Sequence, residues 1–226
     1  MAQLFKPSSN TLVKVCIVGG ILLVIGLLAL TMTIQRSPYI TGVKVAREQP
    51  IAFSHEHHVS GLGIDCRYCH TSVEKSNSAG MPSAHTCMTC HSQIWTNAEM
   101  LEPLRESYRT KKPVEWTRVH KLPDYVYFNH SIHIAKGVAC TTCHGQVGQM
   151  PLLWKENTLY MEWCLSCHRN PAKFVGRKED VFKTRSRKEE AAHTGMRTEE
   201  EQMALGNELI KKYHINPNVD CTACHR

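Results

Sequence analysis

Apolar residues are distributed very unevenly along this chain of 226 residues. Residues 15–34 form an apolar run without a single charged side chain. Twenty helical residues span about 30 Å, which matches the hydrocarbon core of a bilayer. A cleaved signal peptide has a shorter apolar core and a small-residue cleavage site, and no such site follows Leu30. The pattern therefore predicts a retained transmembrane helix over 15–34, preceded by a short N-terminal segment, 1–14.

Hydrophobic periodicity is weak in the rest of the chain, and only two longer helices are indicated. Thr198 and Glu201 form a capping-box signature, which predicts a helix over 199–213. A second helix is expected within 94–110, interrupted or restarted at Pro103, because proline cannot continue the hydrogen-bond ladder of a helix.

Strand signals are short everywhere. The best of them, 125–128, is expected to pack as an extended segment and not in a sheet. The predicted fold class is therefore mainly α and irregular, with one N-terminal transmembrane helix.

The sequence Cys-x-x-Cys-His occurs five times and uses ten of the eleven cysteines. This spacing is the attachment signature of c-type haem, in which two thiols bond to one porphyrin and the next histidine binds its iron. The expected cofactors are five c-type haems. The predicted covalent ligands are Cys66, Cys69, Cys87, Cys90, Cys140, Cys143, Cys164, Cys167, Cys221 and Cys224, and the predicted proximal iron ligands are His70, His91, His144, His168 and His225. The motifs are called sites one to five in chain order.

Cysteines in this pattern have two alternative uses. Paired Cys-x-x-Cys motifs can build Cys₄ zinc sites, but five pairs is an odd number for that scheme. Ten cysteines in an exported domain can also form five disulfides. Neither alternative gives a role to the histidine that follows every motif, so covalent haem is favoured.

Five haems change the usual expectation for a hydrophobic core. Residues 35–226 provide only about forty residues for each large apolar porphyrin, which leaves little chain for a separate core. The fold should therefore be organised by stacked haems, and the polypeptide without haem should remain unfolded, as small metal-dependent domains do.

The formal net charge is +7, which by itself would be compatible with nucleic-acid binding. Ten haem propionates and five ferric porphyrins bring the oxidised holoprotein near +2, by an order-of-magnitude count, so no nucleic-acid partner is expected. Basic residues flank the apolar run on both sides, so the positive-inside rule does not orient it. Haem attachment outside the energy-conserving membrane places the haem domain in the periplasm of a bacterial cell and makes the chain a single-pass inner-membrane protein.

A short pattern, Phe-x-His-x-x-His, precedes sites one and three, at 53–58 and 128–133. It indicates an internal repeat of a two-haem module. The expected exported domain, 35–226, contains a di-haem module at 50–95, a second at 120–172, and a linker with the C-terminal haem at 173–226.

The repeated pattern resembles that of small multihaem cytochromes of the c3 and c7 type. The resemblance implies that His55 and His130 are the distal ligands of sites one and three, and that His58 and His133 reach neighbouring haems. Iron held by two imidazoles has no open position and transfers electrons only. Further candidate distal ligands are His85, His120, His214, Met150 and Met161, while His57 and His193 are expected to be solvated or to lie outside the iron coordination.

Two longer segments resemble the pentahaem, membrane-anchored subunit of alternative complex III. They are WTRVHKLPDYVYFNH at 116–130 and MEWCLSCHRNP at 161–171. The resemblance implies a subunit that carries electrons from menaquinol to a monohaem cytochrome or a soluble carrier. It also implies partners in the same complex, namely polytopic quinol-binding subunits, an iron–sulfur or molybdopterin-like subunit and a monohaem cytochrome c.

Other functions remain as alternatives. The chain could be a stand-alone, membrane-anchored quinol dehydrogenase that feeds a periplasmic reductase, or a free electron-storage cytochrome, which the anchor disfavours. Catalysis by the chain itself needs an open iron, and no Cys-x-x-Cys-Lys motif is present. No catalytic residue is therefore predicted.

Overall fold

The structure is a computed structural model and describes residues 6–185 and 197–225. It divides into two units, Met1–Gly42 and Val43–Arg226. The boundary lies eight residues after the predicted end of the apolar run, because a short helix follows the long one before the chain turns at Gly42. His193, expected to be solvated, lies outside the described residues.

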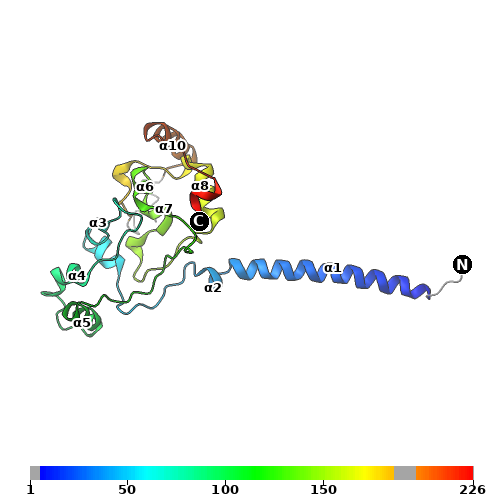
Figure 1. The fold of residues 1–226 in the computed structure, drawn as a ribbon, viewed down its shortest axis with the longest axis horizontal. Helices are drawn as coiled ribbons and strands as arrows, with labels where there is room; N and C mark the ends of the chain where they lie inside the picture. The colour runs from blue at the N-terminus through cyan, green and yellow to red at the C-terminus, as the bar shows by residue number, and fades with distance from the viewer. Residues whose placement is uncertain (1–5, 186–196, 226) are drawn as a thin grey trace. The chain divides into compact units, whose positions relative to one another are not determined.

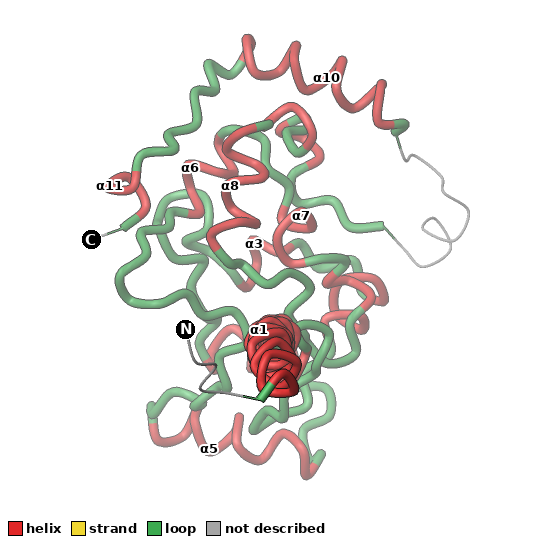
Figure 2. The backbone as a smooth tube through the Cα atoms, turned by 90° about the vertical axis from the view of Figure 1, so that its right-hand side faces the viewer, coloured by secondary structure: helices red, strands yellow, loops and turns green. Residues whose placement is uncertain are grey.

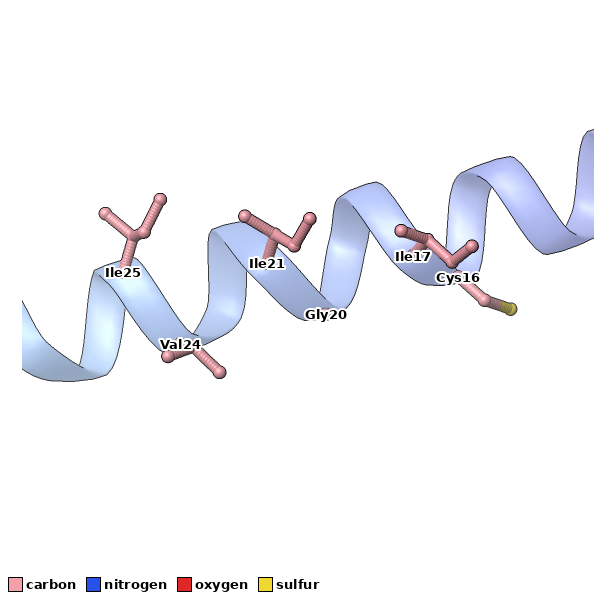
Figure 3. Close-up of a pocket in the computed structure, with 6 residues that line it drawn as sticks. All are labelled: Cys16, Ile17, Gly20, Ile21, Val24 and Ile25. Carbon is pink, nitrogen blue, oxygen red and sulfur yellow. The ribbon is translucent and has the colours of Figure 1, made fainter.

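The N-terminal unit consists of helix α1 (Pro7–Arg36) and the single turn α2 (Pro38–Thr41). Helix α1 is longer than the predicted span at both ends, and it begins where Pro7 provides a preset backbone angle for the first turn. It is apolar and long enough to cross a membrane, and none of its side chains is buried in this chain. A shallow groove along α1 runs past Cys16 and Gly20 and is flanked by isoleucine and valine side chains (Figure 3).

The second unit is built from short helices joined by long irregular segments (Figures 1 and 2). No β-strand longer than an isolated bridge occurs in the described parts of the chain. In chain order its α-helices are α3 (Cys66–Cys69), α4 (Ala84–His91), α5 (Glu102–Thr110), α6 (His130–Ala135), α7 (Cys140–His144), α8 (Met161–Arg169), α10 (Glu199–Lys212) and α11 (Cys221–Cys224). One π-helical turn, η1 (Glu56–Gly61), and four 3₁₀ turns, η2 (Glu99–Leu101), η3 (Val147–Gln149), η4 (Pro171–Lys173) and η5 (Lys178–Asp180), complete the described elements.

Both longer helices predicted within this unit are present. Helix α5 begins at Glu102, so Pro103 lies in its first turn, where a missing N–H costs no hydrogen bond; residues 94–98 are not helical. Helix α10 carries the predicted capping box, with reciprocal hydrogen bonds between Thr198 and Glu201. It ends one residue earlier than expected.

Helix α10 packs on η4 through a glycine. A Cβ atom at Gly206 would collide with the backbone oxygen of Ala172, so only glycine permits this approach. The Gln202 side-chain amide donates hydrogen bonds to the carbonyl oxygens of Ala172 and Val175, at 3.0 and 2.9 Å. Glycine and glutamine thus fix the helix that precedes site five.

The unit buries few apolar side chains. Ile51, Leu101 and Leu104 form a small cluster. The other buried apolar residues are scattered among the loops. Single bridges tie the irregular segments together: Val43 to Lys155, Ala46 to Trp154, Val126 to His225 and Val138 to Val175. Within the segment 125–128, Tyr125 ends a turn and Val126 forms an isolated bridge, so the segment does not belong to a sheet, as predicted.

Candidate haem sites

Each Cys-x-x-Cys-His motif coincides with a short helix or lies within one. Sites one, three and five form α3, α7 and α11, and sites two and four lie in α4 and α8. Residues three apart in a helix share a face, so the two thiols of a motif lie side by side and both can reach one porphyrin. Asp65 and Ser83 start α3 and α4 by accepting hydrogen bonds from the Arg67 and Thr86 backbone N–H groups.

All ten motif cysteines are free thiols. Burial raises the pKa of Cys140 to about 11, of Cys143 to about 12 and of Cys167 to about 11, because it disfavours the charged thiolate. Redox-active cysteines have the opposite property, a lowered pKa. Among the described residues, no group of three or more His, Cys, Asp or Glu side chains is arranged to hold a metal ion. The Cys₄ zinc arrangement is therefore not formed there.

Six histidines are held by main-chain carbonyl groups. In each, Nδ1 lies 2.7–3.2 Å from a backbone oxygen. Such a bond fixes the proton on Nδ1 and leaves Nε2 with a free lone pair for a metal. Each histidine is paired with the residue whose carbonyl oxygen accepts the bond: His58 with Ser54, His70 with Gly80, His91 with Ile94, His130 with Asn77, His133 with Asn129, and His168 with Asn218.

Three candidate distal histidines face motif histidines at one common distance. The ring centroids of His58 and His91 are 6.3 Å apart, and those of His133 and His168 are 6.2 Å apart. Two imidazoles that share one metal ion, with bonds of about 2 Å, have centroids roughly 6 Å apart. The spacing therefore fits an iron between the rings.

The third pair is His130 with His144. Their ring centroids lie 6.4 Å apart and their planes differ by only 9°. This pair agrees with the expectation that His130 is the distal ligand of site three. The His133–His168 pair agrees with the expectation that His133 reaches a neighbouring haem, that of site four.

The internal repeat has a matching geometry. Phe53 lies edge-on to His55, with centroids 4.8 Å apart at 88°, and Phe128 lies edge-on to His130 at the same distance and angle. Phe53 also stacks on His58 at 4.4 Å. The equivalent stack of Phe128 on His133 is at 4.7 Å. The two copies therefore hold their histidines in the same orientation.

Sites one and three share a buried histidine cluster. Burial lowers the pKa of His55 to about 4, of His120 to about 4 and of His144 to about 3; for His55 and His144, neighbouring histidines lower it further. His70 is the first of the histidines that affect His55. All three rings are therefore neutral at pH 7, the form that binds iron.

Two nitrogen atoms in this cluster are buried without a hydrogen-bond partner, Nδ1 of His55 and Nε2 of His120. A buried, unpaired polar atom is costly, so such atoms mark places where a further group completes the bonding. The His120 ring lies against that of His144, with centroids 4.3 Å apart and planes at 73°. The donors of sites one and three thus fit haem iron.

The remaining candidates lie in other surroundings. His85 is near Tyr108 of α5, with ring centroids 6.2 Å apart. His214 follows α10 in a left-handed conformation, with φ of 51°, and its carbonyl accepts a hydrogen bond from Lys136. Among the described residues, neither forms a ring pair with a motif histidine. At site five the ring of Tyr125 lies beside that of His225, with centroids 5.8 Å apart.

The two methionine candidates differ in exposure. Met150 is almost fully buried, and its carbonyl accepts a hydrogen bond from the Glu56 N–H. Met161 is exposed at the first position of α8.

Sequence reasoning did not find the carbonyl groups that orient the histidines. For His58 and His133 a signal existed, because the acceptor lies four residues earlier, one helical turn away. The other acceptors depend on folding. Gly80, for example, returns its carbonyl to His70 from a turn with φ of 77°, a left-handed conformation that suits glycine.

Comparisons with known proteins agree with this arrangement. Residues 126–226, which include sites three, four and five, match the family model described as cytochrome c7 and related cytochrome c. The chain is also 37% identical over 99 residues to the menaquinone reductase, multiheme cytochrome c subunit, of Nitratidesulfovibrio vulgaris. The match covers 43% of this chain and 46% of that relative, so less than half of the relative's length is represented.

The comparisons and the geometry support the same conclusion. A fold organised by haem requires three features that this structure has. They are helical Cys-x-x-Cys-His motifs, imidazole rings in pairs, and a small number of buried apolar side chains. The fold of this chain is cytochrome c7-like, and its C-terminal part, residues 126–226, is similar to cytochrome c7 and related cytochrome c.

Proposed function

We propose that this chain binds five c-type haems covalently and carries electrons through them as the cytochrome subunit of a membrane complex that oxidises menaquinol. The observation that carries the proposal is the set of three histidine pairs with centroids 6.2–6.4 Å apart. When bound, haem supplies an iron that alternates between ferric and ferrous states.

The five motifs provide the thioether bonds and the proximal ligands. The proposed distal ligands of sites two, three and four are His58, His130 and His133. At site one the repeat favours His55, whose pKa is affected by His70, and His120 is the second candidate. With imidazole on both sides, these sites exclude substrate from the iron and favour electron transfer over catalysis.

The protein environment supports this role. The Nδ1 bonds to backbone oxygens prevent the imidazole rings from rotating, which reduces the rearrangement that accompanies a change of iron charge. The lowered pKa values of His55, His120 and His144 keep these rings neutral.

The complex to which the chain belongs is inferred from two resemblances. The segments 116–130 and 161–171 resemble the pentahaem subunit of alternative complex III, and the bacterial relative is named as a subunit of a menaquinone reductase. Both are linked to quinones, which supports menaquinone as the redox partner of the complex. The proposed partner subunits are polytopic quinol-binding proteins, an iron–sulfur or molybdopterin-like subunit and a monohaem cytochrome c.

Helix α1 is the proposed anchor of this subunit. It is apolar over its length and exposed throughout, and Gly19, Gly20 and Gly26 leave room for another helix to approach closely. The haem unit is proposed to lie on the periplasmic side of the bacterial inner membrane, where c-type haems are attached.

Intact-mass analysis of the mature protein tests the haem count. We expect the mass of the polypeptide plus five haems. A mass without added haem contradicts the proposal.

Native purification tests the assignment to a complex. We expect the chain to co-purify with polytopic subunits and to be reduced by a menaquinol analogue only within that complex. Rapid reduction of the isolated chain supports instead the alternative of a stand-alone quinol dehydrogenase that feeds a periplasmic reductase.

A potentiometric titration of the purified complex tests the direction of transfer. Haems with potentials above that of menaquinone agree with menaquinol oxidation. Potentials that all lie below it support menaquinone reduction, the activity in the name of the relative.

A further inference from the structure

We propose that the five haem sites form one continuous row in the order two, one, three, four, five, so that electrons enter and leave at sites two and five. The inference rests on the proposed function, because it assumes that every motif carries a haem. The row does not follow the order of the motifs along the chain, since sites one and two are exchanged.

Sites two and one are joined directly. Tyr68 lies between the two cysteines of site one, and Thr89 lies between the two cysteines of site two. Their hydroxyl groups are 2.9 Å apart and form a hydrogen bond. The two motifs therefore lie side by side at the start of the row.

Sites one and three meet at one short segment. The Cys66 thiol of site one is 3.9 Å from the carbonyl oxygen of Phe182, and the Cys140 N–H of site three donates to the neighbouring carbonyl of Val181, at 3.0 Å. The first cysteines of the two motifs thus contact consecutive residues.

A second contact joins the same two sites. The loop after site one provides the carbonyl of Asn77, which accepts a hydrogen bond from His130, the proposed distal ligand of site three. Site three is therefore the second neighbour of site one.

Sites three and four are connected by helix α6. His130 and His133 lie one turn apart on this helix and face His144 and His168, respectively. Because one helical turn rises by about 5 Å, the proposed distal ligands keep the two irons close.

Sites four and five are connected by a histidine bond. Nδ1 of His168 lies 2.8 Å from the carbonyl oxygen of Asn218, three residues before site five begins. Site five is further fixed by the Tyr127 N–H, which donates to the Cys224 carbonyl at 2.8 Å. It therefore lies next to site four at the end of the row.

The helices that carry the motifs of sites two, one, three and four are arranged in the same order. Figure 1 shows α4, α3, α7 and α8 following one another across the haem unit toward the red C-terminal segment.

The two ends of the row are the sites that contact only one other site. Among the described residues, no hydrogen bond or ring contact joins the site two motif to the motifs of sites three, four or five. The four links above use every motif and leave only sites two and five with a single neighbour. Redox partners are therefore expected to dock at these two sites.

Iron positions in an experimental map of the purified holoprotein test the order. Anomalous diffraction at the iron edge locates each iron, and chain tracing assigns it to a motif. We expect five irons with nearest-neighbour pairs two–one, one–three, three–four and four–five. Fewer than five irons contradict the proposed function. Five irons with other nearest neighbours overturn the order alone.

A matched pair of variants tests the order in solution. His58→Met changes a ligand at an end of the row, and His130→Met changes one in the middle; each should raise the potential of its own haem. Haem-methyl NMR signals, followed through a redox titration, report the other haems. We expect the midpoint potential of one neighbouring haem to shift in His58→Met. In His130→Met we expect the midpoint potentials of two neighbouring haems to shift. The reverse result overturns the order.

Discussion

At the scale of single residues, the important feature is which ring nitrogen of each histidine is available to bind a metal. Six histidines bind a backbone carbonyl through Nδ1, which leaves Nε2 as the metal-binding atom. Because the acceptors are main-chain atoms, side-chain substitution at Ser54 or Asn129 should preserve the orientation of His58 or His133. The phenylalanine stacked on each of these rings adds a second constraint.

Replacement of His133 gives a direct test at this scale. His133→Ala should open the sixth position of the haem at site four, because His133 is the ring that faces His168 at 6.2 Å. We expect carbon monoxide to bind to one more haem in the dithionite-reduced variant than in the wild type.

His57→Ala is the matched control. His57 contacts the rings of His58 and Trp95 but no motif histidine. His57→Ala should leave the number of haems that bind carbon monoxide the same as in the wild type. If His133→Ala behaves like this control, the assignment of His133 is wrong.

At the scale of elements, the motif helices are too short to be stable alone, since isolated helices below about 12 residues are marginal in water. Helices α3, α7 and α11 have four or five residues each. Of these three helices, α3 is capped by the Asp65 side chain, and His225, directly after α11, forms a bridge with Val126. In the proposed holoprotein each helix is also held by two thioether bonds. Helix α10, which carries no haem motif, is longer, with 14 residues and its own capping box.

The packing of α10 on η4 can be tested at Gly206. Gly206→Ala places a methyl group against the Ala172 backbone, which cannot move without shifting η4. We expect destabilisation of about 1–3 kcal/mol, typical of overpacking. Thermal unfolding followed by far-ultraviolet circular dichroism measures the change.

Asn207→Ala serves as the control, because Asn207 is exposed on the same helix. Since alanine has the higher helix propensity, this variant should be neutral or slightly stabilising. Equal effects of the two substitutions would show that α10 does not depend on close packing against η4.

At the scale of the whole molecule, the polypeptide provides too little core to fold alone. Among the described residues, buried apolar side chains are few, and the cluster of Ile51, Leu101 and Leu104 has three buried members. Export without haem attachment should therefore yield an unfolded, protease-sensitive chain. Limited proteolysis of material from cells that lack haem-attachment enzymes measures this. Resistance equal to that of the holoprotein would contradict a fold organised by haem.

The division into two units predicts that the anchor can be removed. If residues 1–42 are replaced by a cleavable export signal, the unit 43–226 should mature as a soluble protein with an unchanged haem spectrum, because α1 buries none of its side chains in this chain. Fractionation and absorption spectroscopy check this. Loss of haem attachment in the truncated protein would show that the N-terminal unit supports folding.

The sequence by itself determined the chemistry of this protein. The fixed spacing within each motif predicts covalent haem, and the apolar run predicts α1. The repeated Phe-x-His-x-x-His pattern indicates four candidate ligands, His55, His58, His130 and His133. These signals are local, because each depends on residues within a few helical turns. The family match over 126–226 agrees with them.

Only the tertiary structure decided which groups meet. No spacing rule joins Tyr68 to Thr89, Asn77 to His130 or His168 to Asn218, since these contacts close loops of many residues. The same holds for Tyr125 beside His225. Local sequence fixes what each haem site is made of, whereas the order of the sites depends on how irregular segments pack, and that packing is a property of the whole chain.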